Sequence, residues 1–323
     1  MLPRGPKLFI AIFSISGLLL ASAALAFPDK PVRIIAGASG AGHDVTARIL
    51  GPRLSEQWGQ PVVVENRAGA GGTIAATAVS KSAPDGYTLL MGDLTQLTTA
   101  AKLYGAMQYN ASRDFAPVSL VLTVPMVVSA HPALPVATLP ELIAYAKQRP
   151  GKVSYASGSI GTIGHLTSAL LGTITGINIV HVPYKGGAAA LVAVMSQEVQ
   201  FASTTALVAA PHIKSGRLKA FAVLAKHRVS VLPDLPTGGE AGIQGLESNA
   251  WFGVVVPART PPQIIGILNR SILDAVRNPA TRSALLAQGG ELATGTPEAF
   301  GEWLRSETVK WDKVIQASGA KPE

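Results

Sequence analysis

Three glycine-rich segments are the stretches of this sequence most able to do chemistry. They are 37–44 (GASGAGHD), 157–165 (SGSIGTIGH) and 184–188 (YKGGA), and each follows an apolar run and precedes a segment with helical periodicity. Glycine lets the backbone approach a ligand closely and adopt positive φ. The first N–H groups of the following helix have no partner within it and carry the positive end of its dipole. Such turns suit a carboxylate and a phosphate equally.

The side chains in these segments allow more than one interpretation. Asp44 fits an N-cap better than a ligand contact, and His165 is either a donor to an anion or an ordinary surface histidine. Lys185 is the one formal cation in the three turns, and a solvated lysine explains it as well. Glycine turns are also simply how strands enter helices. Two similar turns in two lobes nevertheless favour a clamp that holds one small anion from both sides.

A dinucleotide-binding unit is the first alternative. A strand, a glycine loop, a helix and a second strand are followed by Glu65, 23 residues after Gly42. The loop, however, reads G-x-x-G-x-G, whereas the fingerprint is G-x-G-x-x-G. Glu65 can instead pair with Arg67 or Arg48. The secretory signal pattern of the N-terminus, described below, also argues against a dinucleotide enzyme, because soluble nicotinamide cofactors are scarce outside the cytoplasm. We therefore expect no cofactor.

A secreted serine hydrolase that uses Ser159 is the second alternative. SGSIG approaches the G-x-S-x-G elbow, but Ser157 replaces its first glycine. His165 or His181 could serve as the base, yet no acid is set to orient either one. The six histidines are dispersed without H-x-x-x-H or H-E-x-x-H spacing, and there is no cysteine, so we expect no metal site and no thiol catalysis.

The N-terminus has the pattern of a secretory signal peptide. Arg4 and Lys7 precede an apolar run over 8–26, which ends in ALA before Phe27. We therefore expect cleavage after Ala26 and a periplasmic protein, with an uncleaved N-terminal anchor as the alternative. No other segment approaches the roughly 20 apolar residues that span a bilayer.

The mature chain carries 25 basic and 19 acidic residues, since two of the 27 bases and no acid lie in the signal segment, which gives a net charge of +6. The bases are scattered and aromatic residues make up 6% of the chain, so a nucleic-acid-binding face is not indicated. A mild positive balance suits anionic ligands.

The alternation of apolar runs and helical segments predicts an α/β fold with largely parallel sheets. Two extended, proline- and glycine-rich passages, around 115–136 and 226–243, interrupt this alternation and read as linkers between lobes. We therefore expect a signal peptide over 1–26, a discontinuous first lobe over 27–124 and 229–323, and a second lobe over 125–228. Two linkers between α/β lobes form a hinge and a ligand cleft.

Several phrases resemble the Bug family, the periplasmic solute receptors of tripartite tricarboxylate transporter type. The most specific are VVVENRAGAGG, APDGYTLL and HVPYKGG, and similar phrases run through the whole mature chain. The resemblance implies a two-lobed type II periplasmic binding fold with a small carboxylate in the cleft, possible delivery to transporter membrane subunits, and no catalytic residues. We expect a monomer.

The resemblance also implies where the ligand is held, mainly by backbone groups and ordered waters of two strand–helix loops. These loops match 39–44 and 157–162 here, and Asp93–Thr95 and Thr204–Thr205 are expected to complete the cleft. The expected ligand-binding residues are Ser39, Gly40, Ala41, Gly42, His43, Asp44, Asp93, Thr95, Ser157, Gly158, Ser159, Gly161, Thr162, His165, Thr204 and Thr205.

The first loop departs from the family pattern. Members usually have a run such as PFPPGGGTD, whereas this chain has AGASGAGHD, without prolines and with His43 beside the retained Asp44. His43 adds a pH-sensitive donor where the usual ligand contacts would be. The sequence does not name the carboxylate.

Overall fold

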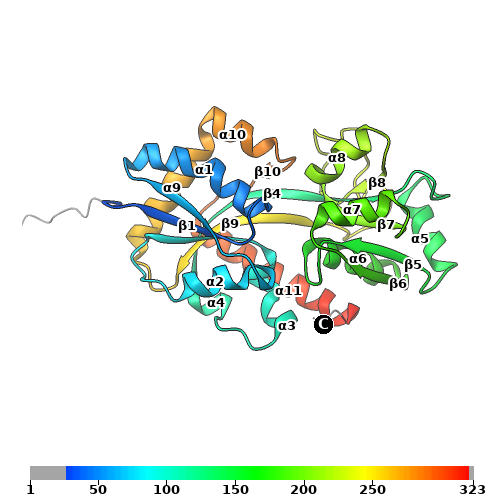
Figure 1. Ribbon diagram of the computed structural model, residues 1–323, viewed down its shortest axis with the longest axis horizontal. Coiled ribbons are helices and arrows are strands. Elements are labelled where there is room, and N and C mark those ends of the chain that lie inside the picture. The colour runs from blue at the N-terminus through cyan, green and yellow to red at the C-terminus, as the bar shows by residue number, and fades with distance from the viewer. Residues whose placement is uncertain (1–26, 320–323) are drawn as a thin grey trace, which may run out of the picture.

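The computed structural model describes residues 27–319 and shows two α/β lobes joined by two long strands (Figure 1). The predicted signal peptide lies outside the described residues. Ten strands form one continuous sheet in the order β2-β1-β3-β9-β4-β7-β5-β6, with β8 and β10 pairing on β4. Within 27–319, no helix is both long enough and apolar enough to cross a membrane.

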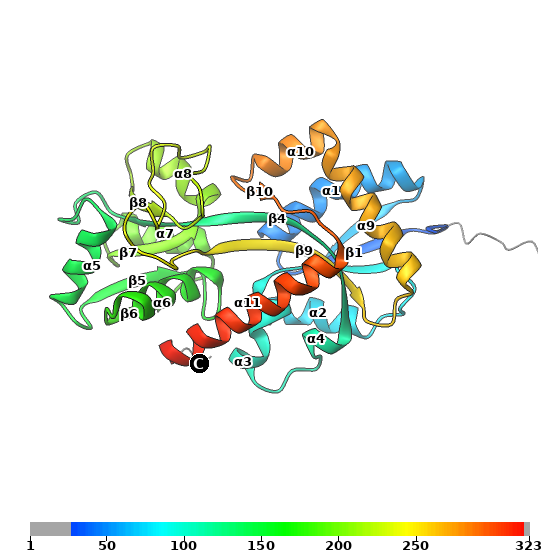
Figure 2. The ribbon, with the colours of Figure 1, turned by 180° about the vertical axis from the view of Figure 1, so that it is seen from behind.

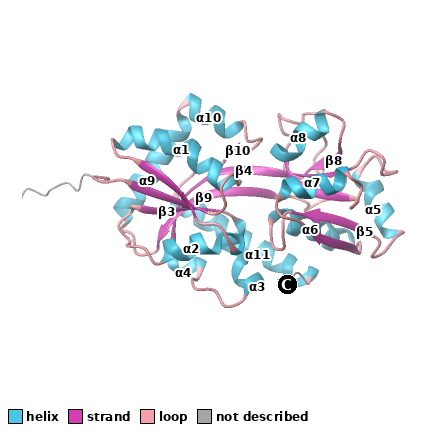
Figure 3. Cartoon of the chain, in the orientation of Figure 1, coloured by secondary structure: helices cyan, strands magenta, loops and turns pink. Residues whose placement is uncertain are grey.

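The first lobe holds the start of the described chain, whereas the last described residues lie against the second lobe. Its strands are β1 (Val32–Ala36), β2 (Val62–Asn66), β3 (Thr88–Gly92), β9 (Asn249–Pro257) and β10 (Glu291–Leu292). Its helices are α1 (Gly42–Trp58), η1 (Ala70–Gly72), α2 (Thr73–Ser80), the π-helix η2 (Thr95–Thr99), α3 (Ala100–Tyr104), α4 (Ala111–Asp114), α9 (Pro262–Arg277), α10 (Pro279–Leu286) and α11 (Pro297–Ser318). Apolar strands such as VRIIA are almost fully buried, because helices cover both faces of the sheet (Figure 3).

The second lobe repeats this layering on a smaller scale. Its strands are β5 (Val153–Ser157), β6 (Ile179–Pro183), β7 (Phe201–Thr205) and β8 (Lys219–Val223). Its helices are α5 (Leu139–Lys147), α6 (Ile163–Thr175), α7 (Gly187–Met195) and α8 (Ala206–Lys214). The predicted α/β class is confirmed, but the sheet is mixed: β1 pairs in parallel with β2 and β3, and β5 with β6 and β7, whereas the pairings of β4 and β9 are antiparallel.

Strand β4 (Phe115–Ala130) belongs to both lobes. Up to Pro125 it pairs with β9, and from Met126 onward it pairs with β7 and β8. Proline has no N–H to donate to a ladder. The partner of β4 changes directly after Pro125, and a register shift follows Pro117. The first 16 residues of the proline-punctuated passage over 115–136, which the sequence marks as a crossover, therefore form a single strand, and its last residues lie outside that strand.

Three backbone hydrogen bonds fasten the two chain crossings to each other. Met126 N–H donates to the Ser248 carbonyl (3.0 Å), Ser248 N–H to that of Leu224 (2.8 Å), and Leu224 N–H to that of Met126 (2.8 Å). Val229 and Leu232 pack in the second lobe's core beside α8 and β8. These contacts favour a return of the chain to the first lobe near Ser248, later than the expected boundary after residue 228. The exact division of the chain into lobes stays a prediction.

Helix α11 crosses the back of the molecule from the first lobe to α6 of the second (Figure 2). It begins as the sequence indicates, with the Thr296 hydroxyl accepting the Ala299 N–H (3.2 Å) and Pro297 at the first position. The buried Glu307 carboxylate accepts the indole N–H of Trp251 on β9 (3.0 Å) and that of Trp311 (2.9 Å). One carboxylate thus pins α11 to a strand that joins the lobes.

Two substitutions of Glu307 should distinguish the contribution of these hydrogen bonds to the free energy of unfolding from the contribution of side-chain packing. Glu307→Leu leaves two buried indole donors unpaired and should lower the free energy of unfolding by about 3 kcal/mol. Glu307→Gln keeps one accepting oxygen and should lower it by only about 1 kcal/mol. Urea titrations of both variants measure the difference, and equal losses would contradict this role of the carboxylate.

Candidate ligand cleft between the lobes

A cavity of about 410 Å³ lies where the lobes face each other. Its lining comes from the first loop, η1, the end of β3, the starts of three second-lobe helices and the joining strand β9. The lining residues are Ala38, Ala41, Gly42, His43, Gly69, Gly71, Gly72, Asp93, Leu94, Thr95, Thr162, Ile163, Gly186, Thr205, Ala250, Trp251 and Phe252. Its volume is within the range of small-molecule sites, roughly 300–1,000 Å³.

Five helices begin at this cavity, and none of the five has a side-chain N-cap. The N-cap residues of α1, α2, α6, α7 and α8 all line the cavity, and none accepts a helix N–H through its side chain. They are Ala41, Gly72, Thr162, Gly186 and Thr205. Away from the cavity, α4, α5, α10 and α11 each have an N-cap side chain that accepts such N–H groups, whereas α9, which begins after Pro261, has none. Donors and positive dipole ends from both lobes therefore face one space.

Asp44 holds the first loop and does not face the cavity. Its buried carboxylate accepts the Gly40 N–H (2.8 Å), Arg48 Nε (2.9 Å) and Asn66 Nδ2 (2.9 Å). Burial alone would raise the pKa of Asp44, but these hydrogen bonds and the charge of Arg48 outweigh it and lower the pKa. Asp44 therefore positions the loop, but not as the N-cap that the sequence suggests: the N-cap of α1 is Ala41, and Asp44 lies in the first turn of the helix and accepts the N–H of Gly40 before it.

Of the other first-loop residues, the structure brings Ala41, Gly42 and His43 to the cavity, while Ser39 and Gly40 lie outside its lining. A Cβ at Gly42 would lie only 2.1 Å from the ring of Phe252 on β9. The loop can therefore meet the joining strand this closely only with glycine at that position.

The second loop meets the cavity through Thr162. Gly158 packs against the backbone of Gly186, where an added Cβ would lie 2.9 Å from two backbone atoms. Gly161, with φ of 75°, faces the Leu103 side chain of the first lobe. Ser159 is exposed, and its carbonyl accepts the hydroxyls of Ser157 (2.9 Å) and Thr162 (2.8 Å). Glycine thus allows both the close packing of two loops and contact across the lobes.

Of the remaining expected residues, some line the cavity and others lie outside its lining. Asp93, Thr95 and Thr205 line the cavity, whereas Thr204 is buried outside the lining. The expected set omits the η1 glycines, Gly186 and the β9 residues that line the cavity. The phrase AGAGG and the third glycine turn carried a signal for the first two groups. Nothing local marks Ala250–Phe252, because their position depends on the pairing of β9 with β3 and β4.

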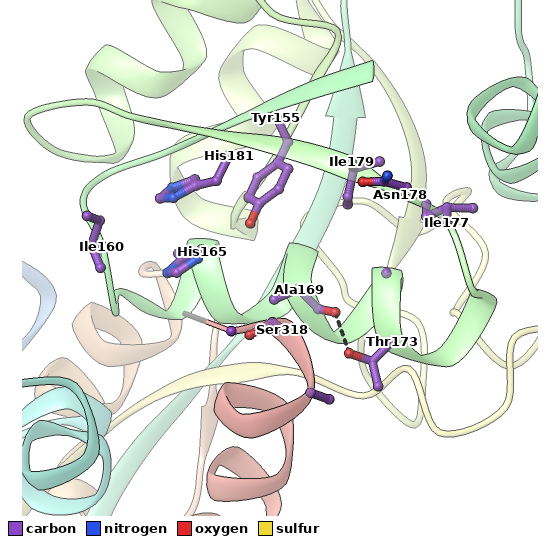
Figure 4. A pocket seen from close by; sticks show the side chains of 13 residues that line it. Tyr155, Ile160, His165, Ala169, Thr173, Ile177, Asn178, Ile179, His181 and Ser318 are labelled. Atoms are coloured by element: carbon purple, nitrogen blue, oxygen red, sulfur yellow. Dashed lines mark hydrogen bonds between the residues drawn. The ribbon is translucent and has the colours of Figure 1, made fainter. Parts of the chain in front are cut away.

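His165 lies behind the second loop, not in the cleft. It lines a second pocket of about 550 Å³ between α6, β6 and the end of α11, together with Tyr155 and His181 (Figure 4). The two imidazole rings stack at 3.9 Å with 9° between their planes. Nδ1 of His165 accepts the Gly161 N–H (3.0 Å), so the proton of the neutral ring is on Nε2. His165 thus supports the loop from its far side.

The geometry gives the hydrolase alternative no working base. The structure pairs His181 with Ser157 (2.6 Å between Nε2 and Oγ), not with the exposed Ser159. Because the Ser157 hydroxyl already donates to the Ser159 carbonyl, the imidazole must donate to Ser157. Among the hydrogen bonds and ion pairs of 27–319, no carboxylate orients His181.

Two further sequence hypotheses can be compared with this geometry. The described part of the chain has no group of three or more histidine, aspartate or glutamate side chains placed to hold a metal. Glu65 accepts Arg67 Nε (2.7 Å) and lies outside the cavity lining. Glu65 is therefore not placed as a ribose-binding acid of this cavity.

The buried histidines should make stability fall in acid. Burial lowers the pKa of His165, with a further contribution from His181, and burial lowers that of His181; both fall from 6.5 to about 4. The unfolded chain therefore binds protons that the folded chain rejects, so stability is full above about pH 6.5 and is lost towards pH 4. After a discount for partial exposure, unfolding should cost on the order of 2 kcal/mol less at pH 5 than at pH 7.

Urea titrations across this pH range test whether the buried histidines cause the loss of stability in acid. Asn at position 165 can still accept the Gly161 N–H but does not titrate, so His165→Asn should remove about half of the pH dependence. His131→Asn is the matched control, because the His131 ring accepts the Ala133 N–H in an exposed turn. An unchanged pH profile in His165→Asn would show that this ring is not responsible.

Comparison with known proteins agrees with this architecture. Residues 46–320 match the family model described as "Tripartite tricarboxylate transporter family receptor". The chain is 36% identical to Protein BugT of Bordetella pertussis over 319 residues, which cover 96% of this chain and 98% of the relative.

Solved structures are similar along almost the whole chain. One is R. palustris Rpa4515 with adipate, with a TM-score of 0.82 and 34% identity over 92% of this chain and 100% of that one. Another is MatC from Rhodopseudomonas palustris with bound malate, with a TM-score of 0.79 and 30% identity over 90% and 100%. The periplasmic binding protein BugD has a TM-score of 0.79 and 33% identity over 92% and 100%. The two-lobed periplasmic binding fold is therefore confirmed.

Proposed function

Because the chain belongs to the tripartite tricarboxylate transporter receptor family, we propose that it binds one small organic carboxylate between its two lobes. Members of this family are periplasmic binding proteins that work with tripartite transporters. The relatives with adipate and with malate bound share the two-lobed fold and hold carboxylates. Their ligands motivate the ligand class proposed for this chain.

One observation carries the proposal: the five helix N-termini at the cavity lack side-chain caps, whereas four helices elsewhere have them. Each N-terminus stabilises a nearby anion by about 0.3–1 kcal/mol at an exposed site, and by more where water is excluded. Backbone N–H groups that donate to a carboxylate form charge-assisted hydrogen bonds. A carboxylate in the cavity supplies the acceptor that no side chain of these helices provides.

Ligand binding in both lobes would favour the closed arrangement. The N-caps Ala41 and Gly72 belong to the first lobe, and Thr162, Gly186 and Thr205 to the second. A ligand that contacts both sets binds the closed state more tightly than the open one, and the difference in affinity shifts the population. The site residues proposed for this role are those of the expected set that line the cavity, namely Ala41, Gly42, His43, Asp93, Thr95, Thr162 and Thr205.

The remaining proposals concern location and partners. The signal pattern over 1–26 supports export to the periplasm with cleavage after Ala26. The mature protein would act as a monomer and deliver its ligand to the membrane subunits of a tripartite tricarboxylate-type transporter. We propose no catalytic step, and a fluorophosphonate probe should therefore leave Ser159 unlabelled.

A thermal-shift screen tests ligand class directly. Mature protein stripped of ligand by unfolding and refolding is mixed with mono-, di- and tricarboxylates. At least one should raise the melting temperature, because a ligand at 100 times its Kd adds about 2.7 kcal/mol to the folded state. If no carboxylate stabilises the refolded protein, the proposed function is wrong.

A substitution at an N-cap tests the mode of binding. Thr162→Asp places a carboxylate where it can cap α6 itself, so the ligand-free protein should keep or gain stability, up to about 1 kcal/mol. The new charge competes with and repels the ligand, so calorimetry should show affinity reduced at least roughly tenfold.

Thr138→Asp is the matched control, because Thr138 is the N-cap of α5 outside the cavity. Its affinity should equal that of the parent protein. Full ligand affinity in Thr162→Asp would mean that the start of α6 does not contact the ligand.

A further inference from the structure

Positive and negative charge lie in different parts of the cavity between the lobes. Five helix N-termini supply positive dipole ends, but its lining, as far as the described residues show, includes no lysine or arginine. The one carboxylate in this lining is Asp93, which directly follows β3. A ligand therefore meets uncapped N–H groups in one part of the cavity and a fixed negative charge in another.

The two oxygens of Asp93 have different surroundings. Oδ1 accepts the N–H groups of Thr95 (3.0 Å) and Gln96 (3.3 Å), which fixes the side chain at the start of the π-helix η2. Oδ2 lies 3.4 Å from Nδ1 of His43, a contact that is an ion pair when the imidazole is protonated. The side chain is 23% exposed, so Oδ2 is an accessible acceptor in a rigidly held carboxylate.

The wall beside Asp93 contains further polar atoms without protein partners. Nε2 of His43 is buried and has none, and neither Oε1 nor Nε2 of Gln96 has one, although this side chain is 1% exposed. A Cβ at Gly37 would contact both His43 Nε2 (2.7 Å) and Gln96 Nε2 (3.2 Å), so the two groups lie close together. Buried polar atoms are normally satisfied, and of these two residues only His43 lines the cavity, so its Nε2 is the atom suited to a polar ligand group or its hydration water.

The negative charge acts on the residues around it. Burial, and then the charge of Asp93, raises the pKa values of Tyr104 and Tyr109. Both phenols therefore stay neutral, and the nearest group that can carry a positive charge beside Asp93 is the His43 imidazole. A second carboxylate brought to this place would meet a like charge with no lysine or arginine in the lining to offset it.

We propose that the ligand carries an ammonium group in addition to its carboxylate, and that Asp93 pairs with this ammonium. The carboxylate lies at the helix N-termini and the ammonium at Asp93 Oδ2, so the cleft selects an amino acid over a dicarboxylate of equal length. This inference rests on the proposed carboxylate-binding function and adds the charge of the ligand's second group.

Matched ligand pairs test the selection by isothermal titration calorimetry. The pairs are 4-aminobutanoate with succinate and 6-aminohexanoate with adipate, which within each pair differ mainly in the charge of one end. Titrations are run at pH 8, where the ammonium and carboxylate ends of the ligands are charged. In at least one pair the amino acid should bind roughly tenfold more tightly than the dicarboxylate.

The two possible failures are distinguishable. If the amino acids fail to bind while a dicarboxylate or another carboxylate from the thermal screen does bind, the ammonium assignment is overturned and the carboxylate receptor stands. If no carboxylate binds at all, the proposed function itself has failed.

Asp93→Asn isolates the charge. Asn can still accept the Thr95 and Gln96 N–H groups, so the turn is kept while the negative charge is removed. The tenfold preference should fall to within roughly threefold, mainly through tighter dicarboxylate binding. Asp85→Asn is the control, because Asp85 accepts the Tyr87 N–H (3.1 Å) in a turn outside the cavity. An unchanged preference in Asp93→Asn would overturn the pairing.

Discussion

The continuity of β4 through both lobes is the constraint on which the rest of this structure depends. Its first part is held by β9 and its last part by β7 and β8, with the change of partner after Pro125. Because strand pairing fixes register and direction, each lobe's sheet is oriented by the same strand. The glycine loops of both lobes therefore meet over β9, where Gly42 packs on Phe252. A cleft between two independently oriented lobes would have no such fixed geometry.

The helices that begin at the cleft lack the stabilisation of an N-cap side chain, and their first N–H groups stay available to a ligand. An N-cap side chain is typically worth about 1 kcal/mol, and five helices at the cavity lack one, whereas α4, α5, α10 and α11 have theirs. The loops keep their shape by other means. Asp44 holds the first from beneath, and His165 accepts the Gly161 N–H behind the second. The supporting side chains thus stay outside the cavity, and the backbone donors stay available inside it.

The charged residues in and behind the cleft have different tasks. Asp44 is surrounded by donors and is fully engaged, so it stabilises the loop without contributing an open acceptor. Asp93 accepts backbone N–H groups through one oxygen, and its other oxygen lies beside the His43 imidazole and remains partly exposed at the cavity. His165 and His181 are kept neutral by burial, so no imidazolium charge competes with the ligand behind the second loop. Two residues of the same type can therefore have different roles. A carboxylate whose oxygens are all hydrogen-bonded within the protein positions the loop, whereas one with an exposed oxygen can select a ligand.

The sequence by itself determined the α/β class, the order of elements and the glycine turns, because apolar periodicity, glycine and proline act locally. It also pointed to Ala41–His43 and Thr162, which line the cavity, but it counted Asp44 among the ligand-binding residues, whereas the Asp44 carboxylate holds the loop outside the cavity lining. Only the tertiary structure decided that β4 is one strand shared by two lobes, that His165 lies behind its loop, and that Ala250–Phe252 line the cleft. The side to which a residue faces at the end of a strand depends on which distant strand pairs beside it, and no local pattern records that pairing.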